Sequence, residues 1–162
     1  MVVKVRVGVF GRHGLTVVEF VIALAILAIL TALAVPNLGK WIQHYRIRGS
    51  VREVVSQMEL CKIRALKSNL EYRVSFDVRK GTFQRQRGNR PDSSSSWTLE
   101  GRESVMPKQV FVVEVTFDHE AAEFNPDGTA TGGRVILATR SGERYRISVN
   151  TTTGRINTIR MD

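Results

Sequence analysis

A single carboxylate inside an apolar stretch is the first candidate for chemistry in this sequence. Glu19 is the only charged residue in the 21-residue run 15–35, which is rich in Leu, Ile and Ala. A charge inside a membrane costs on the order of 2.5 to 3.5 kcal/mol, so such residues are usually functional. A cut after Gly14 would create an α-amino group on Leu15, one helical turn from Glu19. We expect Glu19 to pair with such an amine on a neighbouring subunit and thereby set the register between packed helices.

Arginines near the C-terminus supply a second candidate chemistry, the binding of phosphate. Guanidinium groups pair well with phosphate, although a solvated strand face would also carry them. The chain has 24 Lys and Arg against 15 acids, a net charge of +9. This charge attracts phosphate, anionic lipid or an acidic partner without selecting one of them. The cluster consists of Arg134, Arg140, Arg144, Arg146, Arg155 and Arg160.

The other reactive residue types form no catalytic pattern. The sequence has no phosphate-loop motif and no nucleophile elbow, and Cys61 is its only cysteine. An internal disulfide is therefore excluded, and we expect Cys61 to be a buried, inert thiol. Adjacent residues of a strand point to opposite faces, so we interpret the run 118–120 (Asp-His-Glu) as a solvated loop rather than a metal site. We expect no enzymatic activity, no cofactor and no metal.

A long helix must position Glu19. As a helix, residues 15–35 would span roughly 31 Å, close to the roughly 30 Å hydrocarbon core, and we predict a transmembrane segment there. Residues 1–14 form a basic leader. Pro36 lacks the N–H that would bond back along the helix, so we expect a kink or a loss of hydrogen bonds near residues 32–36.

The apolar run has two other interpretations, which stay open. The first is an ordinary secretory signal, because residues 32–34 (Ala-Leu-Ala) match the small-residue pattern before a cleavage site. A soluble β-domain binding protein would then be released after Ala34. The second is a plain single-span anchor. Neither of them requires Glu19.

The rest of the sequence predicts a helix followed by strands. The helical period resumes after Pro36 and predicts an amphipathic continuation over 36–70. From residue 71 to 162 the period changes to two, which predicts an antiparallel β domain with a polar loop at 88–96. The fold class is therefore α+β: a long N-terminal helix, with a transmembrane half and an amphipathic half, packed on an antiparallel β-sheet domain. The predicted apolar stripe of the helix is Val51, Val54, Met58, Cys61 and Ala65; strands are predicted at 72–78, around Phe83, and at 97–99, 109–115, 121–125, 133–140, 144–149 and 155–159.

The segment 14–20 (GLTVVEF) resembles the processing site of type IV pilins and of the pseudopilins of type II secretion. The resemblance implies that a prepilin peptidase cuts after Gly14 and methylates the new N-terminus on Leu15, where Phe is commoner in the family. Glu19 matches the family's fifth-position glutamate. Pro36 matches the proline that interrupts the family's long helix. The resemblance therefore implies that Glu19 and Pro36 are assembly determinants.

The C-terminal part looks like the β domain of H-type minor pseudopilins and the related FimT-like minor pilins. In some FimT-like pilins an arginine-rich region beginning Gly-Arg takes part in DNA uptake. Gly154 and Arg155 match that start, Asn157 stands where a second arginine would strengthen the match, and Arg160 could substitute. Arg155 and Arg160 are therefore the candidate DNA-binding residues. The matching segments are 124–128 (FNPDG), 134–138 (RVILA), 145–149 (YRISV) and 154–156 (GRI).

These resemblances imply a minor prepilin-like subunit. It would cross the bacterial inner membrane once, with its C-terminal domain in the periplasm, and assemble into a type II secretion pseudopilus or a type IV pilus. An initiation or tip role is expected. Its expected partners are the prepilin peptidase, other pilins or minor pseudopilins, the inner-membrane assembly platform and the lipid bilayer. The alternative is a DNA-binding minor pilin for DNA uptake.

Overall fold

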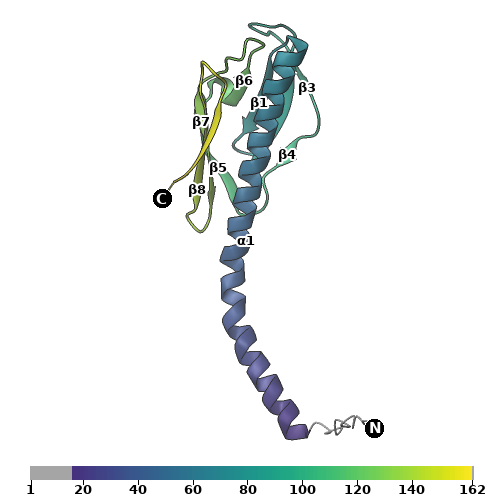
Figure 1. The fold of residues 1–162 in the computed structure, drawn as a ribbon, viewed down its shortest axis with the longest axis vertical. Coiled ribbons are helices and arrows are strands. Elements are labelled where there is room, and N and C mark those ends of the chain that lie inside the picture. The colour runs from purple at the N-terminus through teal and green to yellow at the C-terminus, as the bar shows by residue number, and fades with distance from the viewer. Residues whose placement is uncertain (1–15, 162) are drawn as a thin grey trace, which may run out of the picture. The chain divides into compact units, whose positions relative to one another are not determined.

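The structure is a computed structural model that describes residues 16–161, apart from the side chains of 33–38 and 40. The fold is α+β, as predicted, with one long helix followed by antiparallel strands (Figure 1). The chain forms two compact units, Met1–Gly39 and Lys40–Asp162. Helix α1 has the bounds Val17–Ser68.

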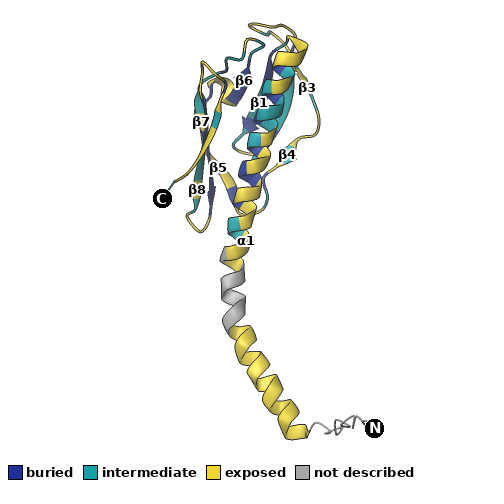
Figure 2. Cartoon of the chain, viewed as in Figure 1, coloured by how far each residue is buried: buried dark blue, intermediate teal, exposed yellow. Residues whose placement is uncertain are grey.

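The first unit is helical from Val17 onward. Thr16 caps the helix: its Oγ1 accepts a hydrogen bond from the N–H of Glu19 at 3.2 Å. The large apolar side chains along this part of α1 are exposed, between 49% at Leu24 and 80% at Val17 (Figure 2). No helix within the described residues is both long and apolar enough to cross a membrane. The side chain of Pro36 lies outside the described part, so the kink at 32–36 stays a prediction.

In the second unit, α1 places one stripe of side chains in the core. All five residues of the predicted stripe are buried, and Val54, Met58, Cys61 and Ala65 are fully so. Their spacing of three and four residues keeps them on one face of the helix. This face packs against inward-pointing side chains of the strands, among them Phe124.

The strands form two antiparallel sheets. The first has the order β3-β2-β1-β6, with β4 also paired to β2, and the second has the order β5-β7-β8-β9. A short 3₁₀ turn, η1 (Asp118–Glu120), leads from the second sheet back to the first. The first sheet comprises β1 (Tyr72–Asp77), β2 (Thr82–Gly88), β3 (Trp97–Leu99), β4 (Ser104–Val105) and β6 (Ala121–Phe124); the second comprises β5 (Val110–Val115), β7 (Gly133–Thr139), β8 (Arg144–Val149) and β9 (Ile156–Met161).

Where both bounds of a strand were predicted, the observed strand starts within one residue and ends within two residues of the prediction. The two-residue strand β4 and the division into two sheets were not predicted. Alternation along a strand gives the side of a sheet on which a side chain lies, but it does not tell which strands share a sheet.

Candidate functional site

The N-terminal turn of α1 contains the described part of the predicted processing segment. Gly14 and Leu15 lie outside the described residues. Thr16 and Glu19 have the three-residue spacing of a capping box, and the bond from the Glu19 N–H to the Thr16 hydroxyl is one of its two hydrogen bonds. The exposed carboxylate of Glu19 thus lies at the positive end of the helix dipole, where a negative charge is favoured. The pairing of Glu19 with a neighbouring amine stays a prediction.

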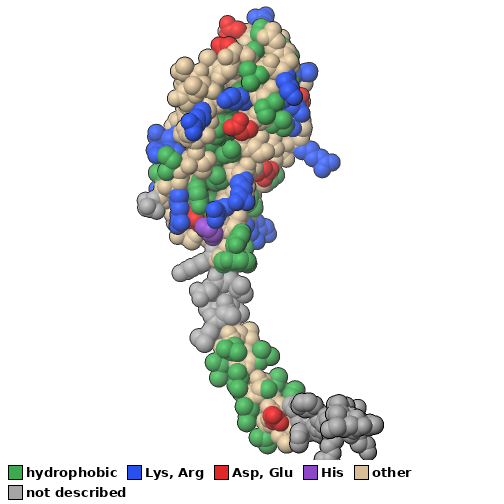
Figure 3. All heavy atoms as spheres, viewed as in Figure 1, with side chains coloured by type: hydrophobic (Ala, Val, Ile, Leu, Met, Phe, Trp, Pro, Cys, Tyr) green, Lys and Arg blue, Asp and Glu red, His purple; other side chains and the backbone are tan. Residues whose placement is uncertain are grey.

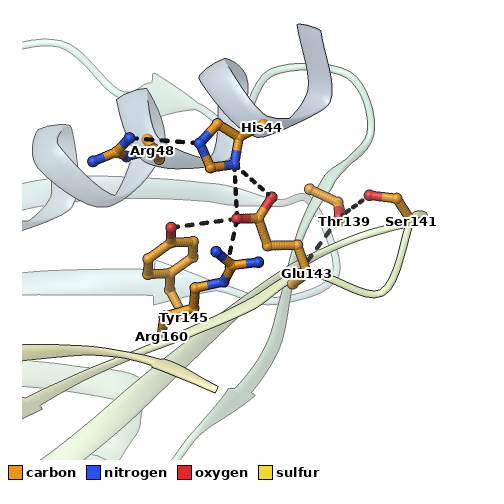
Figure 4. Close-up of polar contacts among 7 residues, drawn as sticks. All are labelled: His44, Arg48, Thr139, Ser141, Glu143, Tyr145 and Arg160. Atoms are coloured by element: carbon orange, nitrogen blue, oxygen red, sulfur yellow. Dashed lines mark hydrogen bonds and ion pairs between the residues drawn. The ribbon is translucent and has the colours of Figure 1, made fainter. Parts of the chain in front are cut away.

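A polar cluster joins α1 to the hairpin between β7 and β8 (Figure 4). Nδ1 of His44 lies 2.9 Å from Oε1 and 3.2 Å from Oε2 of Glu143. Nε2 of His44 lies 3.5 Å from Nη1 of Arg48. A neutral His44 satisfies both contacts when Nδ1–H donates to Glu143 and Nε2 accepts from Arg48.

Glu143 is the centre of this cluster, since its side chain is only 11% exposed. The hydroxyl of Tyr145 donates to its Oε1 at 3.3 Å, and Nε of Arg160 lies 3.7 Å from the same oxygen. A nearly buried carboxylate is costly unless hydrogen bonds and charges surround it, as they do here. Sequence reasoning missed the contact between His44 and Glu143 because 99 residues separate the partners and no local pattern marks either one.

The C-terminal arginines do not form one surface. Arg160 belongs to β9, and Asn157 lies three residues before it in the same strand, so their side chains project from opposite faces of the sheet. The N–H of Asn150 donates to the carbonyl of Arg155, which extends the ladder between β8 and β9 and puts Arg155 on the face of Asn157. The structure therefore does not bring Arg155 and Arg160 together, and Arg160 already contacts Glu143. DNA binding by these two residues stays a prediction.

A second buried carboxylate holds the serine-rich loop. Glu71 is 5% exposed and directly precedes β1. Its two carboxylate oxygens accept hydrogen bonds from the backbone N–H groups of Ser93 at 2.9 Å and Ser94 at 2.7 Å. Hydrogen bonds to a charged acceptor are stronger than neutral ones, so this contact fixes the loop on the end of the first sheet. No local sequence pattern predicts this contact.

The described residues contain no group of three or more His, Cys, Asp and Glu side chains placed to hold a metal. Asp118, His119 and Glu120 form the exposed turn η1. Cys61 is fully buried in the helix stripe. Burial raises the pKa of its thiol from 9.0 to about 12, more than the nearby charge of Arg85 lowers it. A thiol in this state is not a nucleophile at neutral pH.

The chain is similar to known proteins of bacterial secretion. The family profile of type II transport protein GspH matches residues 50–153. The type II secretion system protein H of Xanthomonas campestris pv. campestris is 23% identical over 146 residues, which cover 89% of this chain and 81% of that protein. Two solved structures of the minor pseudopilin EpsH from the type II secretion system of Vibrio cholerae have the same fold, with TM-scores of 0.56 and 0.55 at 12% identity. Each match covers 70% of this chain and 95% of the EpsH chain.

Proposed function

Because the chain belongs to the GspH family of type II transport proteins and is a minor pseudopilin of that type, we propose that it is processed after Gly14 and assembles into a periplasmic pseudopilus. The observation that carries the proposal is Glu19, an exposed carboxylate in the first turn of a helix whose other side chains there are exposed and apolar. Such a helix needs a partner both for its apolar surface and for its one charge.

The lipid bilayer is the first partner in this proposal. Residues 15–35 supply a run of 21 residues with one charge, preceded by a basic leader. The exposed side chains of α1 between Val17 and Leu30 are the apolar surface that lipid would cover. The subunit would cross the inner membrane once and keep its β domain in the periplasm until it is extracted.

Assembly then replaces lipid by the helices of other pseudopilins. Cleavage would leave an amine on Leu15, with methylation as a further step, and Glu19 would pair with the amine of a neighbouring subunit. The pairing favours one axial register because a carboxylate left without a cation inside an apolar bundle is costly. In this proposal the prepilin peptidase and the assembly platform are further partners, and a minor subunit acts at initiation or at the tip.

Processing is tested by substitution at Gly14. We expect Gly14→Leu to block the cut because a bulky side chain does not fit beside the scissile bond, whereas Gly14→Ala is the matched control that keeps most of the cleavage. Mass spectrometry of the mature N-terminus reads the result. Equal processing of the two variants would reject this site, and a chain that begins at Val35 would instead identify an ordinary secretory signal.

Assembly is tested by Glu19→Val, with Thr31→Val as the matched control. Both variants replace a polar side chain of the same helix by Val, but the hydroxyl of Thr31 already bonds to the carbonyl of Leu27 in its own helix at 2.6 Å. We expect both variants to reach the membrane, and only Glu19→Val to be lost from sheared pseudopilus fractions. Normal incorporation of Glu19→Val would contradict the pairing role.

A further inference from the structure

A groove lies between α1 and the end of the second sheet. It has a volume of about 390 Å³ and an apolar floor that includes Val51, Val55 and Tyr145. Among the described residues that line it, none is acidic, and Arg48 and Arg52 are exposed beside it. Figure 3 shows this side of the domain, with apolar side chains next to those of Lys and Arg. The complete lining is Arg48, Val51, Arg52, Val55, Ser56, Tyr145 and Thr158.

The helix has a polar contact with the second sheet near each end of the groove. At one end His44 contacts Glu143. At the other end Nζ of Lys62 donates to the carbonyl of Thr153, in the turn before β9, at 3.0 Å. These two helix positions are 18 residues apart, which corresponds to roughly 27 Å along an α-helix. An extended segment of six residues, roughly 20 Å long, fits within this distance.

Strand β9 forms one wall of the groove, and its outer edge has no partner strand among the described residues. It stands last in the order β5-β7-β8-β9. The hydrogen bond from the Asn150 N–H to the Arg155 carbonyl shows that Arg155 is a hydrogen-bonded position of the ladder with β8. In an antiparallel pair, every second residue then bonds to the partner strand, and the backbone groups of the residues in between point away from it. By this alternation, the backbone N–H and C=O groups of Ile156, Thr158 and Arg160 point to the free edge.

The other sheet edges carry the usual protection against strand addition, whereas β9 does not. A bulge between Val112 and Glu114 interrupts β5. Strands β3 and β4 have only three and two residues, and β6 is bridged at its end by Ala130. In contrast, β9 pairs with β8 over six consecutive residues without a bulge, and it contains neither Pro nor Lys. Its one charged side chain, Arg160, contacts Glu143 of the same sheet. Bulges, short strands, Pro and Lys are the devices that keep an edge from pairing with another chain.

We propose that an extended, acidic and apolar segment of another chain binds in this groove by adding a strand to β9. Its backbone would bond to the free edge at Ile156, Thr158 and Arg160. Its small apolar side chains would cover Val55 and Tyr145, which are half-buried, and its carboxylates would lie near Arg48 and Arg52. Arg52 is the principal counter-charge because it has no ion pair among the described residues, whereas Arg160 contacts Glu143. A second copy of this chain is disfavoured, since each copy carries a net charge of +9.

The experiment measures the binding of a fluorescein-labelled eight-residue peptide, Val-Ser-Glu-Ser-Val-Ser-Glu-Ser, to the full chain in detergent micelles. In an extended strand its Val and Glu side chains lie on one face, so they can contact the apolar floor and the two arginines of α1 together. Thr158→Pro removes an N–H from the free edge but none from the ladder with β8, because Pro is tolerated where the N–H faces outward. We expect Thr158→Pro to weaken binding about tenfold, which corresponds to the loss of about one hydrogen bond. Thr158→Val is the matched control, since it keeps the N–H and the branched side chain, and it should bind like the parent.

A second pair of variants tests the charge. We expect Arg52→Glu to weaken the peptide at least fivefold. Arg144→Glu changes the net charge by the same amount, but its side chain lies on the other face of the same sheet from Tyr145, so it should leave the affinity unchanged. Equal weakening by both variants would show general attraction of an acidic peptide to a basic protein and would overturn the proposal.

Hydrogen exchange gives a readout that does not require any variant to fold. We expect the bound peptide to slow exchange of the Thr158 and Arg160 N–H groups, while those of Asn157 and Ile159 are already protected by β8. Protection that is absent from Thr158 and Arg160, or tighter binding of a single-stranded oligonucleotide at the same residues, would reject the peptide assignment. This binding needs neither processing nor assembly, so its failure is distinguishable from failure of the proposed function.

Discussion

Cys61 gives a quantitative test of how tightly α1 packs on the strands. Its thiol is fully buried, and burial raises its pKa from 9.0 to about 12. At pH 8 a thiol with its ordinary pKa is roughly one-tenth thiolate, whereas one with a pKa near 12 is roughly one part in ten thousand, because the thiolate fraction falls tenfold per pH unit below the pKa. We therefore expect the folded chain to react with a disulfide reagent about a thousand times more slowly than the chain in urea.

The same shift predicts how stability depends on pH. A thiol whose pKa is raised on folding keeps its proton in the folded state, while the unfolded chain begins to lose it above pH 9.0. The contribution is therefore complete below pH 9 and is lost as the pH rises from 9 toward 12, at about 1.4 kcal/mol per pH unit and about 4 kcal/mol in total. Other groups also titrate there, so the quantity to compare is the difference in free energy of unfolding between the parent and Cys61→Ala.

The assay is urea denaturation followed by circular dichroism between pH 8 and pH 10.5, together with the reaction rate of the thiol. The difference between the parent and Cys61→Ala should shrink above pH 9, while the cavity left by Ala adds an offset that does not change with pH. A difference that stays constant over this range, with a folded-state reaction rate within tenfold of the unfolded one, would refute the burial of Cys61 and with it the packing of the stripe.

Two further variants test other contacts of the second unit. Met58→Ala should lower the free energy of unfolding by about 2 to 5 kcal/mol because it leaves a cavity at a fully buried site. The control Ile63→Ala, at a position 46% exposed, should lower it by less than about 1 kcal/mol. Similar losses for the two variants in urea denaturation would contradict the assigned face of α1. Glu71→Ala should cost about 2 kcal/mol, since it removes two charged hydrogen bonds whose donors, the N–H groups of exposed Ser93 and half-buried Ser94, water can partly satisfy. It should also speed amide exchange in the loop 92–95 at least tenfold. Asp92→Ala, at an exposed position of the same loop, is the control, and unchanged exchange in Glu71→Ala would disprove the anchoring.

Periodicity was sufficient to predict the helix and every strand of this fold except the two-residue β4. The spacing of Met58 and Cys61 predicted the buried face of α1, and the alternation along 144–149 predicted β8 with its observed bounds. These patterns are local consequences of helix and strand geometry, so they are visible in the sequence itself. The glutamate in the first turn was likewise visible, because a charge in an apolar run is conspicuous.

The contacts that join the elements were not predictable in the same way. Glu143 and Glu71 look like ordinary surface acids in the sequence, yet each is nearly buried and each has partners far along the chain. Such contacts depend on which strands share a sheet and on where the helix crosses them. For the same reason, the arginine cluster read from the sequence divides between two faces once the register of β9 is known.

The two ties of α1 to the second sheet have a mechanical consequence. His44 attaches the helix to the turn between β7 and β8, and Lys62 attaches it to the turn between β8 and β9. The two attachments therefore lie at opposite ends of β8. A force directed along the helix axis therefore acts on both attachments and on the buried stripe between them at the same time, in shear. Contacts loaded together in shear share the force, whereas contacts at the end of a peeled strand break one after another. We therefore expect the second unit to resist a force applied along α1 better than a force that separates the strands one hydrogen bond at a time.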